Sequence, residues 1–508
     1  MNGRREETVD GWTSAAVEFD PFAEAITASA PATPHQREIW AAAQLGGEAD
    51  IAYNQAFCVH LTGKLDRDAL AGALRELVAR HQALRLCFAS DGESLCLRAD
   101  ADVDVPVESL AASGRTLADI EQHEVSTPFD LVHGPLIRFR IAVLGPTEHA
   151  VLVTAHHVIC DGWSIGVLID EMARLYAESN PPGPAPGFLA YAEQWAADEV
   201  AGTFAAQESW WLENLADAPA QLDLPLDHPR PPMRRFCADC ETLDLPDATV
   251  ATVRTLAAET GCTPFTVISA AFTAWLHRLT DSGRVVIGVP AAGQPAAGLP
   301  GLVGHCVSLL PVYSHLDPGT AVSDYLANFR EWWLDANDHR DISLGRIVER
   351  LGIRRNPGSI PLVQVVLNMD REMPAPSFGE GLAARVRMLP KRCENFEWFV
   401  NAQQTGEGIR FECTYNTALF SAESMRERLD SLATFIRAFC SDSGQAVESL
   451  ALFGDADGRR LAEWGTGPAI PLENTSLDRL IVAQCADTPR AVAVSQGEQT
   501  LRYAELEA

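Results

Sequence analysis

Two histidines, an aspartate and a glycine lie within residues 156–162, which read HHVICDG. Histidine is the side chain best suited to move protons or to orient a nucleophile near neutral pH. The glycine allows a tight turn of the backbone beside the two imidazoles. This segment is therefore the strongest candidate in the chain for a catalytic site.

The flanking sequence predicts how this segment is held in place. Residues 150–155 (AVLVTA) have the composition of a strand, and residues 164–178 carry apolar side chains at helical spacing. The histidines then stand on the loop between the end of a strand and the start of a helix. Catalytic groups are commonly carried by loops that a rigid frame holds in this way.

Three interpretations of the segment compete. The histidines could cap a strand end or fill space there, His157 and Asp161 could hold a metal ion, or the segment could serve acyl transfer. The metal interpretation lacks a third ligand and a second Cys/His cluster, so we expect no metal site. Cys160 is a further candidate nucleophile beside His157, although adjacent loop positions need not bring their side chains together. The rest of the sequence favours acyl transfer.

The composition is that of a large globular protein with more than one domain. Of the 508 residues, 47% are hydrophobic and 21% charged, and the net charge is −30. This acidity argues against nucleic acid and anionic membranes as partners, since both need clustered Lys and Arg. We expect neither a signal peptide nor a membrane-spanning segment. The 12 cysteines are isolated apart from the Cys237–Cys240 pair, which fits a reducing compartment and predicts a cytoplasmic protein.

Individual elements can be placed from their start signals and periodicity. An aspartate opens a helix at residues 66–81, and a Thr-Pro pair opens another at residues 265–279. Alternating or continuous apolar character predicts strands at residues 136–144, 284–290 and 302–312.

Breaks rich in proline and glycine divide the chain. Those at residues 181–187 and 225–232 flank helical material and mark a boundary between two lobes. Strands are mixed with long helices on both sides, which predicts an α/β (α+β) fold with two comparable lobes. The predicted divisions are a linker or docking segment at 1–31, a first lobe at 32–215, a second lobe at 216–453, a linker at 454–475 and a C-terminal piece at 476–508.

With its motifs laid out in this order, the chain resembles the condensation domains of nonribosomal peptide synthetases over residues 32–453. Residues 156–162 match the HHxxxDG signature of that family in full. Further similar segments are residues 33–40 (TPHQREIW), 80–88 (RHQALRLCF), 287–290 (IGVP), 302–305 (LVGH) and 355–357 (RNP), together with Asn368; His35 and Glu38 depart from the family pattern.

The resemblance implies two lobes similar to chloramphenicol acetyltransferase, arranged as a V-shaped pseudo-dimer with a central tunnel. Two carrier proteins approach opposite faces, each with a thioester on a phosphopantetheine arm, and the acceptor amine attacks the donor thioester to form an amide. The domain itself binds no cofactor. Two alternatives are the epimerisation of a carrier-bound residue, whose companion motifs we do not find, and an inactive platform that recruits partner enzymes, in which the histidine motif is typically eroded.

The resemblance also implies roles for the residues of the motif. His157 positions or deprotonates the amine, and His156 shapes the loop around it. Asp161 is expected to be structural, in an ion pair with Arg85, and Gly162 keeps the loop backbone close to the tunnel. These four loop residues form the predicted catalytic group.

Three more residues are predicted to contact substrate. Ser164 either donates to the developing oxyanion or caps the helix, and Trp163 stands beside it. Gln294 occupies a position where many peptide-accepting relatives have an arginine. If it faces the tunnel, its neutral amide weakens any preference for a polar donor.

Residues 36–46, 291–294 and 302–311 are similar to condensation domains placed after polyketide modules. We therefore expect a polyketide-type acyl donor, delivered by a carrier protein on a separate polypeptide. Residues 477–506 resemble the first segment of an adenylation domain and include no Gly-rich phosphate loop. A downstream carrier protein and an adenylation domain are the other expected partners.

Overall fold

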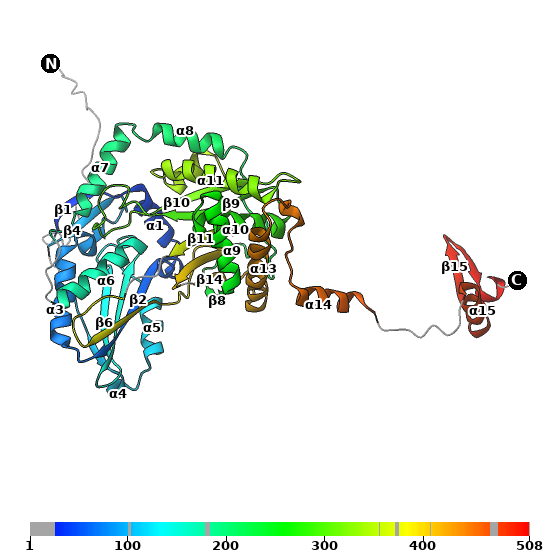
Figure 1. Ribbon diagram of the computed structural model, residues 1–508, viewed down its shortest axis with the longest axis horizontal. Helices are drawn as coiled ribbons and strands as arrows, with labels where there is room; N and C mark the ends of the chain where they lie inside the picture. Colours follow the sequence, from blue (N-terminus) through cyan, green and yellow to red (C-terminus); the bar gives the residue numbers. More distant parts are fainter. Residues whose placement is uncertain are drawn as a thin grey trace, which may run out of the picture. The chain divides into compact units, whose positions relative to one another are not determined.

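The computed structural model describes residues 26–99, 103–177, 183–354, 356–370, 375–406, 408–467 and 476–506. Two compact units make up the chain, Met1–Leu452 and Phe453–Ala508 (Figure 1). No helix within the described ranges has the length and apolar character needed to cross a bilayer.

The first main sheet of the larger unit has the order β12–β2–β7–β6–β5, antiparallel except between β5 and β6. Every residue of β7 from His149 to His156 is buried, because the sheet is covered on both faces. The strand predicted at 150–155 is thus the inner part of a longer strand that ends at the first histidine of the motif. The five strands are β2 (Asn54–Gly63), β5 (Val107–Ser109), β6 (Ile137–Val143), β7 (Glu148–His156) and β12 (Leu382–Met388).

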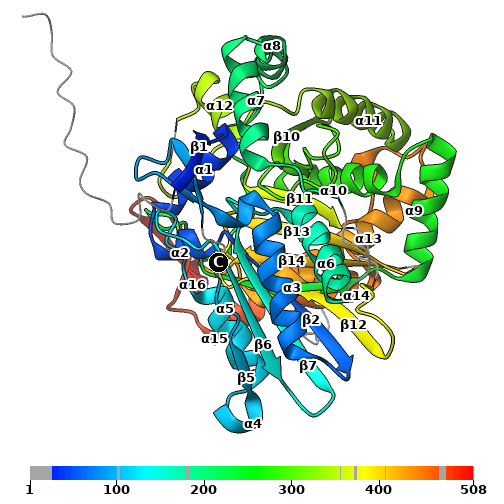
Figure 2. The same ribbon diagram turned by 90° about the vertical axis from the view of Figure 1, so that its left-hand side faces the viewer.

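Helices cover both faces of this sheet. On one face, α3 (Arg67–Arg80) packs beside α6 (Gly162–Tyr176), and Figure 2 shows the two in front of β2, β6 and β7. On the other face lies α5 (Leu117–Ser126). The Asp66 carboxylate caps α3, which confirms the helix predicted at 66–81.

A smaller sheet of order β1–β4–β3 contains β1 (Ile26–Pro31), β4 (Ser94–Arg98) and β3 (Leu86–Phe88). Residues 26–31 of the linker or docking segment predicted at 1–31 thus form a strand of this sheet, and residues 1–25 lie outside the described residues. Only Ala30 of β1 is buried. Residues 26–31 (ITASAP) accordingly lack the alternation of apolar and polar side chains that indicates a strand.

Short helices connect these elements and lead to the second half of the unit. They are α1 (Pro34–Ala43), α2 (Gly47–Ile51), η2 (Gln82–Arg85), α4 (Leu110–Ser113), α7 (Phe188–Val200) and α8 (Ala205–Asn214).

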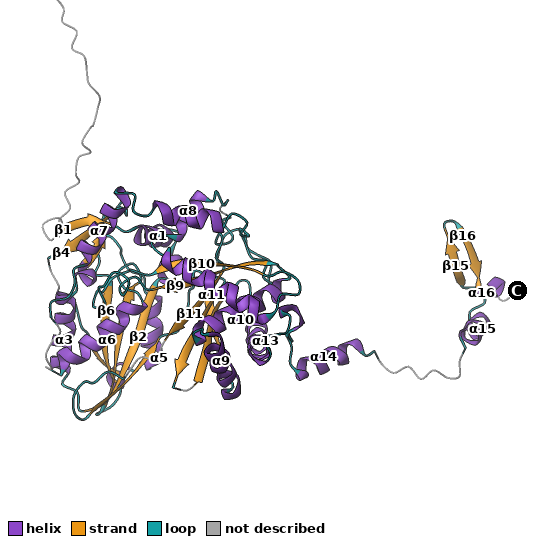
Figure 3. Ribbon diagram, turned by 45° about the horizontal axis from the view of Figure 1, so that its top comes forward, coloured by secondary structure: helices purple, strands orange, loops and turns teal. Residues whose placement is uncertain are grey.

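The second main sheet has the order β10–β9–β11–β13–β14–β8. Helices α9, α10, α11 and α13 pack on one face, and Figure 3 shows them gathered beside the strands. Helices α8 and α12 pack on the other face. The strands are β8 (Ala238–Asp244), β9 (Arg284–Ala291), β10 (Ser308–His315), β11 (Val365–Asp370), β13 (Trp398–Thr405) and β14 (Gly408–Asn416). The helices are α9 (Asp247–Thr260), α10 (Pro264–Thr280), α11 (Val322–Asp338), α12 (Leu344–Arg350) and α13 (Ala422–Ser441), followed by η3 (Val447–Ser449).

These elements confirm the helix predicted at 265–279 and the strand predicted at 284–290. The strand predicted at 302–312 is wrong in its first half, because β10 begins only at Ser308. The backbone N–H groups of Gly304 and Cys306 bond to side chains from the first half of the chain instead of to a neighbouring strand. An apolar sequence alone does not reveal this use of the backbone.

One strand crosses from the second half of the chain to the first sheet. β12 pairs antiparallel with β2, from Leu382 opposite Gly63 to Met388 opposite Phe57. The division into lobes at 32–215 and 216–453 is therefore wrong for this segment, because β12 completes the sheet of the first lobe. Mixed sheets with helices on both faces confirm the α/β (α+β) class.

The second unit is small. It contains α14 (Asp455–Gly465), α15 (Leu477–Asp487), the hairpin of β15 (Val492–Gln496) and β16 (Gln499–Arg502), and α16 (Tyr503–Leu506). The linker predicted at 454–475 is thus helical over 455–465, and residues 468–475 lie outside the described ranges.

Candidate active site

Asp161 closes the HHVICDG loop by capping α6. Its carboxylate accepts hydrogen bonds from the backbone N–H of Ser164 at 2.9 Å and from the Ser164 hydroxyl at 2.7 Å. A carboxylate at a helix start satisfies N–H groups that have no partner within the helix and interacts favourably with the helix dipole. Only 1% of Asp161 is exposed. A buried carboxylate therefore fixes the end of the loop that carries His157 to the start of α6.

A second loop reaches the same carboxylate from the other half of the unit. This bridging loop comprises residues 292–307, between β9 and β10. Nε2 of Gln294 donates to both carboxylate oxygens of Asp161, at 2.9 and 2.8 Å. The backbone N–H of Cys306 donates to Oδ2 at 2.9 Å. The bridging loop thus supplies three hydrogen bonds to Asp161, in addition to the two from Ser164.

Asp161 has no cationic partner among the described residues. Burial raises the pKa of its carboxyl group, and the hydrogen bonds from Cys306, Ser164 and Gln294 act in the opposite direction. The predicted ion pair with Arg85 is wrong, because that guanidinium donates to the carbonyl oxygen of Arg98 at 3.1 Å. The Asp161 carboxylate faces the bridging loop and is held by neutral donors.

Two residues predicted to contact substrate are part of this buried support. Gln294 is fully buried with its amide on Asp161, so its predicted contact with the donor is wrong. Ser164 is also fully buried, and its hydroxyl lies between Asp161 and the backbone of Gly304. Of the two roles considered for Ser164, the structure supports holding the helix start and not donation to an oxyanion.

His156 is likewise buried. Its Nδ1 accepts a hydrogen bond from the backbone N–H of Val158 at 3.3 Å, and its ring contacts those of Tyr53 and Phe129. Nε2 lies 3.2 Å from a carboxylate oxygen of Asp50, although outside hydrogen-bonding geometry. These contacts support the expectation that His156 shapes the loop, and they leave its ring no access to a reactant.

His157 is the histidine of the motif that stays partly exposed. Its Nδ1 donates to the carbonyl oxygen of Cys160 at 2.8 Å, which leaves Nε2 as the unprotonated nitrogen of the neutral ring. Within the described residues no group hydrogen-bonds to this Nε2. Burial, followed by the charge of Lys391, lowers the pKa of His157 to about 4, while the Cys160 carbonyl acts to raise it. The ring is therefore neutral at pH 7 and can accept a proton at Nε2.

The structure places another histidine, His305 of the bridging loop, against His157. The two Nδ1 atoms are 3.3 Å apart, and the rings meet edge to face at 4.9 Å. Residues 302–305 resemble a family landmark, but that resemblance assigns no function to this histidine. Local sequence patterns do not predict this contact, because it joins residues 148 positions apart. It also lies in the bridging loop, part of which the sequence predicts to be a strand.

Trp163 and Gly162 lie at the exposed start of α6. The indole N–H of Trp163 donates to the carbonyl oxygen of Pro300 at 2.8 Å, so this side chain links α6 to the bridging loop. The ring is 40% exposed, and its predicted contact with substrate stays a prediction. A Cβ at position 162 would meet no atom within 4 Å, so no neighbouring residue requires a glycine there.

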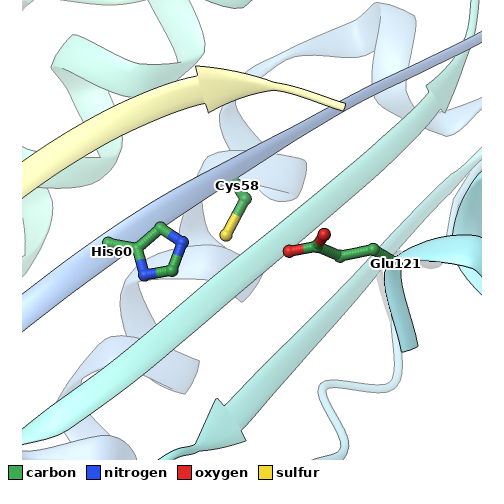
Figure 4. A group of neighbouring side chains, drawn as sticks. All are labelled: Cys58, His60 and Glu121. Atoms are coloured by element: carbon green, nitrogen blue, oxygen red, sulfur yellow. The ribbon is translucent and has the colours of Figure 1, made fainter. Parts of the chain in front are cut away.

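The metal interpretation of His157 and Asp161 is wrong, because both carboxylate oxygens are taken up by N–H and O–H donors. Among the described residues, one group of metal-type side chains lies elsewhere, on β2 and α5. Figure 4 shows Cys58, His60 and Glu121, whose potential ligand atoms lie within 4.8 Å of one another. Arg387 is already ion-paired with Glu121, and burial raises the pKa of the Cys58 thiol to about 12. The group is arranged for an ion pair more than for a metal ion.

The chain is similar to known proteins in sequence and in fold. The sequence profile of the Condensation domain family matches residues 26–462. The chain is 29% identical to tyrocidine synthase 3 of Brevibacillus parabrevis over 94% of its own length, and 26% identical to bacitracin synthase 1 of Bacillus licheniformis over 93%. It spans only 7% and 9% of these two relatives.

Solved structures agree in fold. The four-domain nonribosomal peptide synthetase holo-AB3403, bound to AMP and glycine, has a TM-score of 0.82 at 19% identity and covers 98% of this chain and 39% of its own. The first condensation domain of the CDA synthetase has a TM-score of 0.72 at 20% identity and covers 84% of this chain and 100% of its own.

The fold is that of a two-lobed acyltransferase similar to chloramphenicol acetyltransferase. The chain belongs to the family of condensation domains of nonribosomal peptide synthetases, which form peptide bonds between carrier-bound substrates. The tunnel between the lobes stays a prediction.

Asp161→Asn should lower the free energy of unfolding by about 1–3 kcal/mol, the usual cost of leaving buried donors without an acceptor. The new amide group would face N–H groups of Gln294 or Cys306. Urea unfolding measures the change, with Asp170→Asn on the exposed side of α6 as the control, which should change stability little. Equal effects of the two substitutions would contradict the role given to Asp161.

The stability of the protein should fall as the pH drops from about 6.5 toward 4. Burial lowers the pKa of His35, His157 and His277 to about 4, and that of His305 well below its ordinary value. Because the unfolded chain then binds more protons than the folded protein, each histidine contributes a slope of up to about 1.4 kcal/mol per pH unit.

Urea unfolding at several pH values tests this expectation, with His277→Gln as the comparison. This variant should show a pH dependence smaller by about one proton. Protonation of Asp161 has the opposite sign, but it is common to both proteins and cancels in the difference. A difference in stability that does not change with pH would show that His277 titrates normally in the folded protein.

Proposed function

We propose that this chain forms an amide bond between a donor acyl or peptidyl thioester and the amine of an acceptor aminoacyl thioester. Both reactants are carried by partner proteins on phosphopantetheine arms, and the chain itself holds no cofactor. The observation that carries the proposal is the state of His157, which is neutral, fixed through Nδ1 to Cys160, and open at Nε2. Membership of the condensation domain family supplies the reaction class.

The chemistry follows from this geometry. The acceptor amine attacks the thioester carbonyl, which forms the N–C bond and leaves a tetrahedral intermediate with a positively charged nitrogen. That nitrogen is far more acidic than the free amine, so a weakly basic imidazole suffices to take its proton. The C–S bond then breaks, and the donor thiolate recovers the proton. Holding two tethered reactants in register accounts for much of the rate, and His157 supplies orientation and proton transfer.

The partners follow from the reaction. An upstream carrier protein presents the donor, and a downstream carrier protein with its adenylation domain presents the acceptor. The likeness of residues 477–506 to the start of an adenylation domain supports the second of these. That the donor carrier is a separate polypeptide, and that the protein is cytoplasmic, remain parts of the proposal.

His157→Ala should lower the single-turnover rate of amide formation by about 10²–10⁴-fold, the usual contribution of a positioned acid–base group. Loaded donor and acceptor carrier proteins are mixed with the protein, and intact mass of the acceptor carrier follows the transfer. The exposed His315→Ala is the control and should keep the wild-type rate. A wild-type protein that binds carriers without transfer would indicate a recruiting platform, and an inverted stereocentre without chain transfer would indicate epimerisation.

The donor is proposed to be a polyketide-type acyl group. Gln294 gives no support for this donor class, since its amide is buried on Asp161. The likeness of residues 302–311 to domains that follow polyketide modules remains as support. Transfer of an acyl and an aminoacyl group from the same donor carrier should favour the acyl group. A strong preference for the aminoacyl donor would reject this donor class while leaving amide formation intact.

A further inference from the structure

His305 is held against His157 by the backbone on either side of it. Its neighbour Gly304 donates its backbone N–H to the Ser164 hydroxyl at 3.0 Å, and the Gly304 carbonyl oxygen lies 2.9 Å from that hydroxyl, whose single proton it shares with Asp161. Its other neighbour, Cys306, donates its backbone N–H to Asp161. His305 is 6% exposed, so its ring has little freedom to turn away. The contact between the two histidines is therefore a fixed feature of the place where the halves of the unit meet.

The hydrogen bonds determine which nitrogen of each ring carries a proton. A carbonyl oxygen only accepts, so the bond to Cys160 places a proton on Nδ1 of His157. Nδ1 of His305, at 3.3 Å from that N–H, can take part only as a second acceptor. Its own proton then lies on its Nε2. The pair is thus arranged so that Nδ1 of His157 donates to two acceptors and Nε2 keeps its lone pair.

We propose that His305 is a positioning residue for amide formation, which holds His157 in the Nδ1-protonated form and accepts from its Nδ1–H when Nε2 takes up the substrate proton. The inference rests on the proposed function and adds a residue of the second lobe to a site that the motif places in the first. His305 itself gains and loses no proton during the reaction.

The role requires that His305 stay uncharged while His157 becomes an imidazolium. The charged or titratable groups that act on the pair are His35 of α1, His156, and Lys391, which follows β12. Burial first, and then the neighbouring His157 and His35, hold the pKa of His305 well below its ordinary value. His305 is therefore neutral at pH 7 and remains an acceptor. A protonated His305 would present a second N–H to His157 and remove this support.

Two substitutions separate positioning from packing. His305→Ala removes the acceptor, and His305→Asn keeps an oxygen acceptor close to the position of Nδ1. We expect His305→Ala to lower kcat about tenfold, as for the loss of one hydrogen bond to a charged group, with KM for both carrier proteins unchanged. His305→Asn should retain kcat within about twofold. Thermal unfolding of both variants shows whether the fold is kept, and the Asn variant preserves the test if the Ala variant does not fold.

A measurement without carrier proteins tests the tautomer directly. In protein labelled with ¹⁵N-histidine, the ring nitrogens of His157, assigned by comparison with His157→Ala, should show the Nδ1-protonated form at pH 7. His305→Ala should shift this ring toward a mixture of tautomers, and His305→Asn should restore it. A purely structural role would not move this signature in a folded variant.

The outcomes distinguish this inference from the proposed function. Absence of transfer by the wild-type protein would reject the proposed function, whereas the tautomer of His157 would still report on the pair. Transfer by the wild type with unchanged kcat in His305→Ala would overturn the role of His305. The same conclusion would follow from an Nε2-protonated His157 in the wild type, or from equal impairment of the Ala and Asn variants.

Discussion

The site depends on one buried carboxylate that both halves of the larger unit must satisfy. Removing an ionised group from water is costly unless its lone pairs are occupied, and Asp161 is almost completely buried, with no cation beside it in the described part of the chain. Ser164 from its own helix start and the bridging loop from the other half occupy those lone pairs. The carboxylate therefore acts as the point at which the two halves are held in register.

This constraint explains the surroundings of His157. The motif provides the Cys160 carbonyl that fixes Nδ1, while the bridging loop provides His305 on the other side of the same nitrogen. Trp163 adds a third link, from the exposed start of α6 to Pro300. If the bridging loop moved away, Asp161 would lose donors and His157 would lose a neighbour at once. Support of the fold and orientation of the His157 ring are thus two effects of the same contacts.

Much of this could be predicted from the sequence, and the reason lies in local signals. Apolar periodicity and capping residues predict the helix at 66–81 and the strand and helix around the motif. These signals depend only on residues that are close together in the sequence. The likeness to a known family then indicated the two-lobed fold, and it also underlies the proposal that His157 is the base. Distant contacts were not accessible in this way. The expected partner of Asp161 was Arg85, whereas the structure supplies Gln294, and no local pattern distinguishes these two choices.

The misjudged elements share one physical cause, which is that their backbone or side chains are satisfied far along the chain. β1 is a strand only because β4 pairs with it, and residues 302–307 are a loop because their N–H groups bond to the first half. β12 completes a sheet that is otherwise formed more than 200 residues earlier. In such elements tertiary contacts determine the secondary structure and override the local propensity of the sequence.

β12 is synthesised long after the other strands of the first sheet. β2 has β7 on one side and β12 on the other, so until β12 is made the first sheet ends in an open edge. Residue 388 leaves the ribosome about 230 residues after the end of β7, a delay of roughly 10–50 s at about 5–20 residues per second. If the rest of the first sheet forms during that interval, β2 stands at its edge with one side unpaired, and such an edge can pair with strands of other chains. The free edge of β2 is then exposed until β12 is synthesised and pairs with it.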